Sequence, residues 1–209
     1  MAFSKMEVKI FTSSHGTEFH HFPQTLAQIF AENSFIQYPL IDAEPGRMFH
    51  ATFFKKYKED FEGIQNQDTP RISVIIIGDN NIRNEAFRGG FRILQMAGKL
   101  IELHKGTIHP LLFFGLMPSP ITHCSTYQLA EYSDSRVEDL FKAAQKESQT
   151  NGKLFTFVRL SEFFEDEGSV MRDLFFEKDK IHLNQKGAQT LAQQILRFAT
   201  QVAENYQKY

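Results

Sequence analysis

The run Val74-Ile75-Ile76-Ile77, followed directly by Gly78-Asp79-Asn80-Asn81, decides the fold of this chain. A continuous β-branched run is typical of a strand that is buried on both faces of a parallel sheet. The glycine and the polar residues after it predict that the strand ends there and leads into a turn. In parallel sheets, functional groups gather beyond the carboxyl ends of the strands, so we expect this turn to belong to a site.

Strand and helix signals alternate on both sides of this run. Five strands separated by helices predict an α/β fold with three layers, in which a doubly wound parallel sheet has right-handed crossovers. The other strand candidates are 8–11, 35–41, 110–116 and 154–160, and the helix candidates are 23–32, 47–61, 85–104 and 133–148. A closing helix begins after Asn184, its predicted cap, with Leu191, Ile195, Phe198 and Val202 on one face.

The bulk composition is that of one globular domain, which we expect to span 1–209. Its 209 residues can bury a substantial core, and the formal net charge of −2 gives no general attraction to nucleic acid or anionic membranes. The net charge does not exclude a local basic face on the surface. The sequence contains no run of about 18 apolar residues, so no membrane span is expected. A single cysteine, Cys124, excludes an internal disulfide and favours a reducing compartment, so we expect a cytoplasmic protein.

The stretch Asp179-Lys180-Ile181-His182-Leu183-Asn184 precedes the closing helix. A hydroxyl nucleophile needs a base, a group that orients the base, and donors for the oxyanion. His182 is the candidate base, and Asp179, three residues earlier, is the candidate group that fixes its tautomer. Ser14, three residues after Phe11 of the first strand, is the candidate nucleophile. These residue types predict acyl transfer through a catalytic triad.

The candidate oxyanion hole combines the backbone N–H groups of Ser14 and Gly46 with the side-chain amide of Asn80. A glycine permits close backbone approach, and an amide donates hydrogen bonds without adding a charge. This chemistry needs no metal or cofactor. His20-His21 lacks a third ligand at metal spacing, so no metal site is predicted there. Cys124 falls in a predicted loop with no helix N-terminus to activate its thiol.

These blocks resemble those of the SGNH (GDSL-type) hydrolase superfamily. Asp179 to Asn184 resembles the last block of that family, Gly78 to Asn81 its Gly-x-Asn-Asp block, and Pro45-Gly46 its glycine block. The resemblance spans residues 8–195 and implies a compact, five-stranded, flavodoxin-like sheet. It also implies a serine esterase that acts on small-molecule esters, among them lipids, acyl thioesters and acetylated sugars.

Two positions depart from the family pattern. Thr12-Ser13-Ser14 stands where the family has Gly-Asp-Ser, which makes Ser13 a rival nucleophile. Ser14 is preferred because its distance from the strand matches the family spacing. Asn81 replaces the usual aspartate, which predicts a weaker turn behind Asn80. Pro118-Ser119-Pro120 resembles a proline-rich loop that often lies beside the family's site.

Other functions remain open at this point. The altered first block favours an SGNH-like domain that binds RNA or protein without catalysis, although the near-neutral charge argues against the RNA version. An esterase domain of a retrotransposon-type, nucleic-acid-associated protein combines both ideas. Asp179 and His182 argue for catalysis, since a pure binding domain does not need them. His15 is a candidate pocket residue, and Arg83 and Arg88 either face solvent, pair with acids or contact an anionic substrate group.

Overall fold

The computed structural model of the chain describes residues 5–13, 22–31, 33–37, 39–65, 67–120, 124–148, 154–167 and 169–207. Of residues 124–127 it describes only the backbone. Ser14, His15, His20 and His21 lie outside these residues. So does the segment 121–123.

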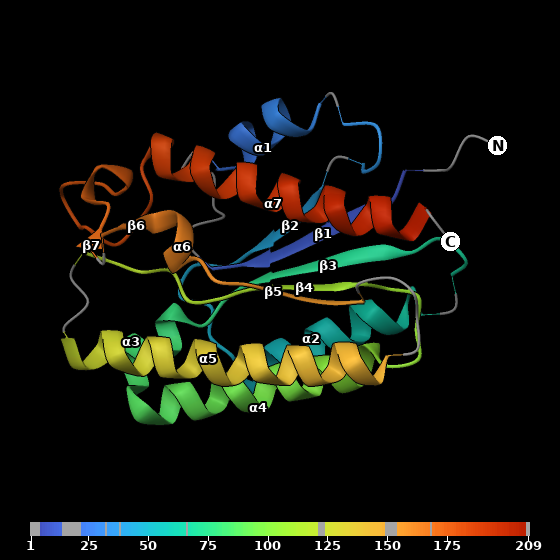
Figure 1. Cartoon of the computed structure of the whole chain (residues 1–209), viewed down its shortest axis with the longest axis horizontal. Coiled ribbons are helices and arrows are strands. Elements are labelled where there is room, and N and C mark those ends of the chain that lie inside the picture. Colours follow the sequence, from blue (N-terminus) through green and yellow to red (C-terminus); the bar gives the residue numbers. More distant parts are fainter. Residues whose placement is uncertain are drawn as a thin grey trace.

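Five parallel strands form the central sheet in the order β2-β1-β3-β4-β5, which confirms the predicted parallel α/β fold (Figure 1). The central strand β3 pairs with β1 on one side and β4 on the other. The strands are β1 (Glu7–Thr12), β2 (Leu40–Ala43), β3 (Arg71–Ile76), β4 (Leu111–Phe114) and β5 (Phe155–Val158). A two-stranded hairpin of β6 (Glu165–Asp166) and β7 (Ser169–Val170) was not expected from the sequence.

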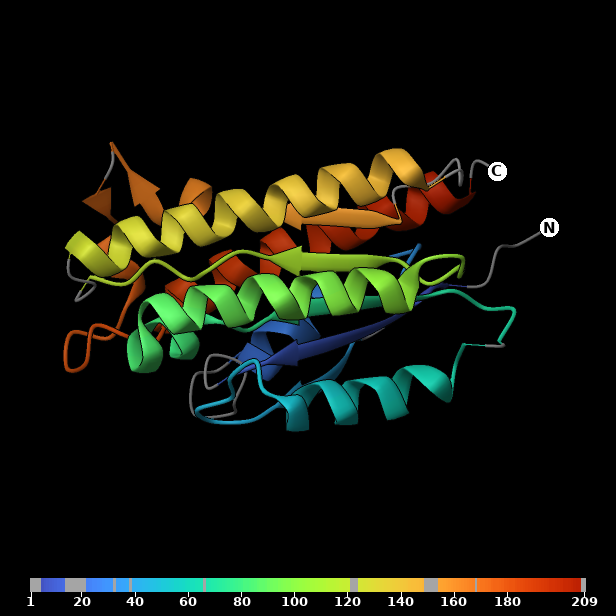
Figure 2. The same ribbon diagram turned by 90° about the horizontal axis from the view of Figure 1, so that it is seen from below.

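Helices cover both faces of the sheet (Figures 1 and 2). One face carries α1 (Phe22–Phe30) and α7 (Gln185–Gln207). The other carries α2 (Ala51–Glu62), α3 (Asp79–Glu85), α4 (Phe87–His104) and α5 (Cys124–Glu147). Short helices α6 (Ser161–Phe164) and η3 (Arg172–Leu174) lie between β5 and α7 in the sequence. No helix in the described part of the chain is long and apolar enough to cross a membrane.

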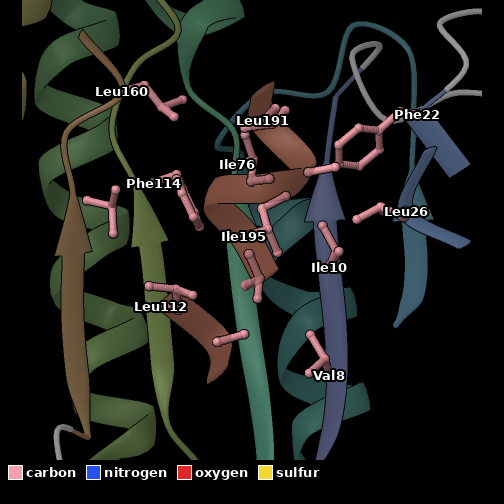
Figure 3. Packing of buried hydrophobic residues seen from close by; sticks show 14 of the residues in the cluster. Val8, Ile10, Phe22, Leu26, Ile76, Leu112, Phe114, Leu160, Leu191 and Ile195 are labelled. Atoms are coloured by element: carbon pink, nitrogen blue, oxygen red, sulfur yellow. The ribbon is translucent and has the colours of Figure 1, made fainter. Parts of the chain in front are cut away.

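The β-branched run of β3 supplies both layers of the core because successive side chains point to opposite faces. Val74 and Ile76 pack in the cluster that includes α1 and α7, where Ile195 and Leu191 meet the sheet (Figure 3). Ile75 packs in the second cluster, with residues of α2, α4 and α5. All of β3 is buried, as its sequence predicts.

Three predicted element boundaries are wrong. The second strand begins at Leu40 instead of residue 35, because Ile36 forms only an isolated bridge with Met6 before the chain turns away. The second helix begins at Ala51 instead of residue 47. The helix predicted for 85–104 begins at Phe87 as α4, and the short helix α3 before it was not predicted; Ala86, whose φ of 47° lies in the left-handed region, separates the two.

The fifth helix also differs from its prediction. It begins at Cys124, whereas the apolar pattern predicted a start at Ser133. The expectation that Cys124 lies in a loop away from a helix N-terminus is therefore wrong. Closing helix α7 begins as predicted, because Asn184 Oδ1 accepts a hydrogen bond of 3.0 Å from the Gly187 N–H.

A buried polar cluster lies at the amino end of the sheet, beside β3 and β4. His104 is fully buried, and its Nδ1 lies 2.6 Å from the carbonyl oxygen of His109. A carbonyl only accepts, so Nδ1 carries the proton and Nε2 accepts from the Tyr57 hydroxyl at 2.6 Å. Burial, opposed by the hydrogen bond to His109, lowers the pKa of His104 to about 3. The imidazole is therefore neutral in the folded protein.

Candidate active site

The candidate site lies at the carboxyl edge of the sheet. The parallel strands all end at the left of Figure 1, where α3, the start of α5 and the loop before α7 also lie. Asn80 enters α3 directly after β3, and Gly46 follows β2. His182 and Asp179 come from the loop before α7. Residues that are distant in the sequence thus meet at one end of the fold, as predicted for a parallel sheet.

Asp179 and His182 form a hydrogen-bonded pair. Asp179 Oδ2 lies 2.9 Å from His182 Nδ1, and its Oδ1 accepts the backbone N–H groups of Ile181 at 2.9 Å and His182 at 3.0 Å. Lys180, between them, has a φ of 54°, so the backbone curls back on the carboxylate. The three-residue spacing therefore brings the acid to the ring, as the sequence analysis predicted.

The electrostatics of this pair fix the tautomer of the histidine. Partial burial acts to raise the pKa of Asp179, but the hydrogen bonds from the His182 ring and from the backbone of His182 and Ile181 outweigh it and lower the pKa to about 2. The carboxylate is therefore ionised at neutral pH and accepts a hydrogen bond from the Nδ1–H group. In the neutral imidazole, Nε2 is then the basic nitrogen.

The loop that carries this pair is anchored to the start of α7. The Phe176 N–H donates to the carbonyl of His182 at 2.9 Å, and the Lys180 N–H donates to the carbonyl of Phe176 at 2.8 Å. Asn184 Nδ2 donates to the carbonyl of Asp173 at 2.7 Å. Gly187 packs so closely that a Cβ there would lie 2.1 Å from the Leu174 carbonyl oxygen. This bracing limits the positions that His182 can adopt.

Ser119 ties the same loop to the end of β4. Its side chain is 2% exposed, and its Oγ donates a hydrogen bond of 2.9 Å to the carbonyl of Lys180, between the two candidate catalytic residues. The proline-rich loop around Ser119 is visible in the sequence, but no role for the serine was predicted from it. No local pattern indicates this contact, because it joins residues 61 positions apart.

We expect Ser119→Ala to lower kcat by about tenfold with little change in KM, because the Asp179–His182 loop loses an anchor and the base moves from its working position. Ester hydrolysis by the purified variant measures this effect. Ser133→Ala is the matched control, since Ser133 is also buried and donates to a backbone carbonyl, that of Leu129 at 2.8 Å. Equal kcat losses in both variants would show that Ser119 has only a structural role.

Gly46 and Asn80 are brought together by the loop that follows β2. Gly46 has a φ of 71°, in the region that favours glycine, and a Cβ built there would meet nothing within 4 Å. Asn80 Nδ2 donates to the carbonyl of Arg47, the next residue, at 3.1 Å. An amide carries two N–H donors, so this bond leaves Asn80 a second one. Arg47 is itself held by Asp42 at 2.6 Å.

Asn81 fastens the same loop from inside. It is fully buried, and its Oδ1 accepts the Phe49 N–H at 2.7 Å. Its Nδ2 lies 3.5 Å from the carbonyl of Phe49. The asparagine that stands in place of the family's aspartate thus contacts both backbone groups of Phe49. It joins the start of α3 to the loop that carries Gly46.

We expect Asn81→Ala to lower the free energy of unfolding by about 1–3 kcal/mol, because it leaves the buried N–H of Phe49 without an acceptor. Chemical denaturation measures the change. The control is Asn84→Ala on the same helix, where the side chain is exposed and its only described contact is with Met48 Sδ at 3.7 Å. A loss of stability that is equal in the two variants would contradict the role assigned to Asn81.

Ser13, the rival nucleophile, is unsuited to the role. Its side chain is fully buried directly after β1, and its Oγ has no hydrogen-bond partner among the described residues. A nucleophile must reach both a base and its substrate. Ser14, the preferred candidate, lies outside the described residues, so its assignment stays a prediction.

Asp134, a buried acid that was not predicted from the sequence, lies next to the segment that follows β4. Asp134 of α5 is 5% exposed, and its two carboxylate oxygens lie 3.0 and 3.1 Å from the Leu116 nitrogen. Burial raises its pKa to about 7 against the opposing effects of this backbone bond and of Arg159. It borders a cavity of about 40 Å³ next to Asp79 and Pro118. Asp134 holds the backbone that leads to Ser119.

In the described part of the chain, no group of three or more histidine, cysteine, aspartate or glutamate side chains is arranged to hold a metal ion. Arg83 lies 3.9 Å from Asp79, and Arg88 is exposed.

Comparisons with known proteins identify the fold. No protein-family model matches the sequence, and no curated protein matches it. Solved structures do match. A lipolytic G-D-S-L family member from Veillonella parvula is similar over 93% of this chain and 98% of its own, with a TM-score of 0.66 and 15% identity.

Two further structures link the fold to acyl chemistry in other proteins. An acetyl xylan esterase matches 92% of this chain and 98% of its own, with a TM-score of 0.59 and 13% identity. A salicylyl-acyltransferase from a tetracycline biosynthetic pathway matches 94% of this chain and 55% of its own, with a TM-score of 0.61 and 14% identity. Together with the sheet order and the carboxyl-edge site, these likenesses show that the chain has the fold of the SGNH hydrolases.

Proposed function

We propose that this protein is a serine esterase that hydrolyses small carboxylic esters through an acyl-enzyme. The observation that carries the proposal is the Asp179–His182 pair, in which an ionised carboxylate 2.9 Å from Nδ1 leaves Nε2 as the basic nitrogen. The esterase and acyltransferase that share the fold support the reaction class. The position of the pair at the carboxyl edge supports it as well.

In the proposed reaction, Ser14 Oγ attacks the ester carbonyl carbon while His182 Nε2 takes the hydroxyl proton. Asp179 stabilises the imidazolium that forms. The negative charge on the carbonyl oxygen is met by the backbone N–H groups of Ser14 and Gly46 and by the amide of Asn80. His182 then gives the proton to the alcohol as the carbon–oxygen bond breaks.

The second half of the reaction releases the acid. Water attacks the acyl-serine, His182 takes the proton of that water, and Ser14 leaves with the proton returned to it. An alcohol in place of water would give acyl transfer by the same steps. The Gly46 N–H supports the oxyanion role, since it donates to no other group among the described residues.

The proposal is tested by the hydrolysis of p-nitrophenyl acetate and of a longer-chain p-nitrophenyl ester. We expect turnover by the natural protein and none above background by Ser14→Ala. Ser13→Ala is the matched control, because it removes a neighbouring hydroxyl that makes no hydrogen bond within the described structure. Full activity of Ser14→Ala would refute the nucleophile. Folded protein without turnover on either ester would instead favour an SGNH-like binding domain.

A further inference from the structure

An exposed aromatic patch lies on the outer surface of α4 and α5. Phe87 is 73% exposed, Phe91 63% and Tyr132 60%, and these three residues define the patch. Phe87 and Phe91 lie one helical turn apart on α4, and Tyr132 is on α5. Large apolar side chains that are exposed singly are common in proteins, whereas a contiguous group of them marks a contact surface.

The three side chains are contiguous because they border one groove. A cavity of about 100 Å³ between the two helices is lined by all three of them and also by Leu94, Leu129 and Arg136. In Figure 2, α4 and α5 lie side by side on the near face, and no described element covers them.

The charges that flank the patch are positive. Arg88 follows Phe87 on α4, and Arg136 follows Tyr132 by one turn on α5; both are exposed. Neither guanidinium forms an ion pair with any other residue in the described structure. The acids nearest in sequence do not line the groove: Glu85 pairs with Arg92 at 2.6 Å, Glu138 pairs with Lys142 and Arg159, Asp134 is buried, and Asp139 borders a different hollow beside Phe155.

We propose that the aromatic patch docks the protein on an anionic lipid surface. Exposed aromatic side chains enter the boundary between headgroups and acyl chains, while neighbouring arginines bind lipid phosphates. A second copy of this chain fits less well. A symmetric contact through the patch would bring the arginines of one copy, Arg88 and Arg136, close to the arginines of the other copy, and like charges repel.

The location of the patch gives the docking a consequence for function. Phe87 begins α4, just after α3 leaves the carboxyl end of β3, and Tyr132 lies in the first half of α5, which starts at the same end. The patch therefore lies at the end of the molecule that carries Asn80 and the candidate site (Figures 1 and 2). A protein docked there would hold that end near the lipid surface. The binding itself does not depend on the proposed esterase activity.

The test is co-sedimentation of the full chain with vesicles of phosphatidylglycerol and with vesicles of pure phosphatidylcholine. We expect binding to the anionic vesicles. Arg88→Gln with Arg136→Gln should weaken it by about 30-fold, and high salt should weaken it as well. Phe87→Ala with Phe91→Ala should weaken it by about 100-fold, because two phenyl rings no longer leave water. Leu40→Ala, which changes a side chain that is 53% exposed on β2, is the control and should bind normally.

Three results would overturn the proposal. The first is equal or absent binding to the two kinds of vesicle by folded protein. The second is binding that the paired phenylalanine substitutions do not weaken. The third is a dimer in solution that the same substitutions dissociate, which would assign the patch to a second copy. Hydrolysis of soluble p-nitrophenyl acetate should not change in the patch variants, so a failure of the esterase assignment and a failure of lipid docking can be distinguished.

Discussion

Replacing His182 with alanine is expected to lower kcat for ester hydrolysis by about 10⁶-fold, and replacing Asp179 with alanine by about 10⁴-fold. The base accepts the serine proton in the first half of the reaction and the proton of the attacking water in the second, so its loss removes the chemistry. The acid only holds the ring and stabilises its cation, so its loss costs less. Steady-state kinetics with p-nitrophenyl acetate measure both effects.

The double variant makes this prediction sharper. The effects on kcat of replacing residues that act as one unit are not additive, so the double variant should be no slower than His182→Ala alone. The fold should persist in all three variants because the His182 and Asp179 side chains are 27% and 40% exposed. Asp173→Ala is the control, since it breaks an exposed ion pair with Lys186 near the same loop. A double variant whose loss of kcat equals the product of the two single losses would contradict the assigned roles. So would an Asp179→Ala variant with full activity.

The second prediction concerns the pH dependence of stability, which two buried groups affect in opposite directions. The pKa of His104 is about 3 in the folded protein, below the 6.5 of an ordinary histidine. Between these values the unfolded chain binds a proton that the folded protein does not. His104 therefore makes the free energy of unfolding fall by up to about 1.4 kcal/mol for each unit of acidification below pH 6.5.

Asp134 has the opposite effect. Its pKa is about 7 in the folded protein and near 3.8 in an unperturbed aspartate. In this window the folded protein holds a proton that the unfolded chain lacks. Acidification from pH 7 to 4 therefore raises the contribution of Asp134 to stability, by up to about 1.4 kcal/mol per pH unit. The two slopes largely cancel in the natural protein where the windows overlap.

Single substitutions should reveal each slope. Asp134→Asn keeps an acceptor for the Leu116 N–H but cannot titrate, so its stability should fall steeply between pH 6.5 and 4. A His104→Leu variant has lost the opposite slope, and its stability relative to pH 7 should rise on acidification. Urea denaturation at a series of pH values measures both. If the two variants and the natural protein gave parallel curves, these protonation states would be wrong.

The sequence predicted those parts of the fold that local patterns encode. The β-branched run at 74–77 indicated a strand buried on both faces, and the structure buries all of β3. The Asp179–His182 pair was also predictable, because a three-residue spacing brings both side chains together within one loop. Asn184 acts as the predicted helix cap for the same local reason.

The features that the sequence analysis missed depend on contacts between distant segments. Ser119 reaches Lys180 across 61 positions, and Asp134 reaches Leu116 across 18. Ser119 lies in the proline-rich loop noted in the sequence, but no local pattern indicates either of these contacts, so only the folded chain shows what the two residues do. The start of α4 was placed at Glu85 instead of Phe87 because Ala86 is an ordinary helix former, whose left-handed backbone conformation the sequence does not indicate.

The most direct test of the account is to trap the proposed nucleophile. A fluorophosphonate transfers its phosphonyl group to an activated serine and releases fluoride, and mass spectrometry of the digested protein locates the group. We expect one adduct, on Ser14, that is absent from Ser14→Ala and strongly reduced in His182→Ala. An adduct on Ser13 or Cys124, or folded protein that takes up no label, would contradict the Ser14–His182–Asp179 assignment.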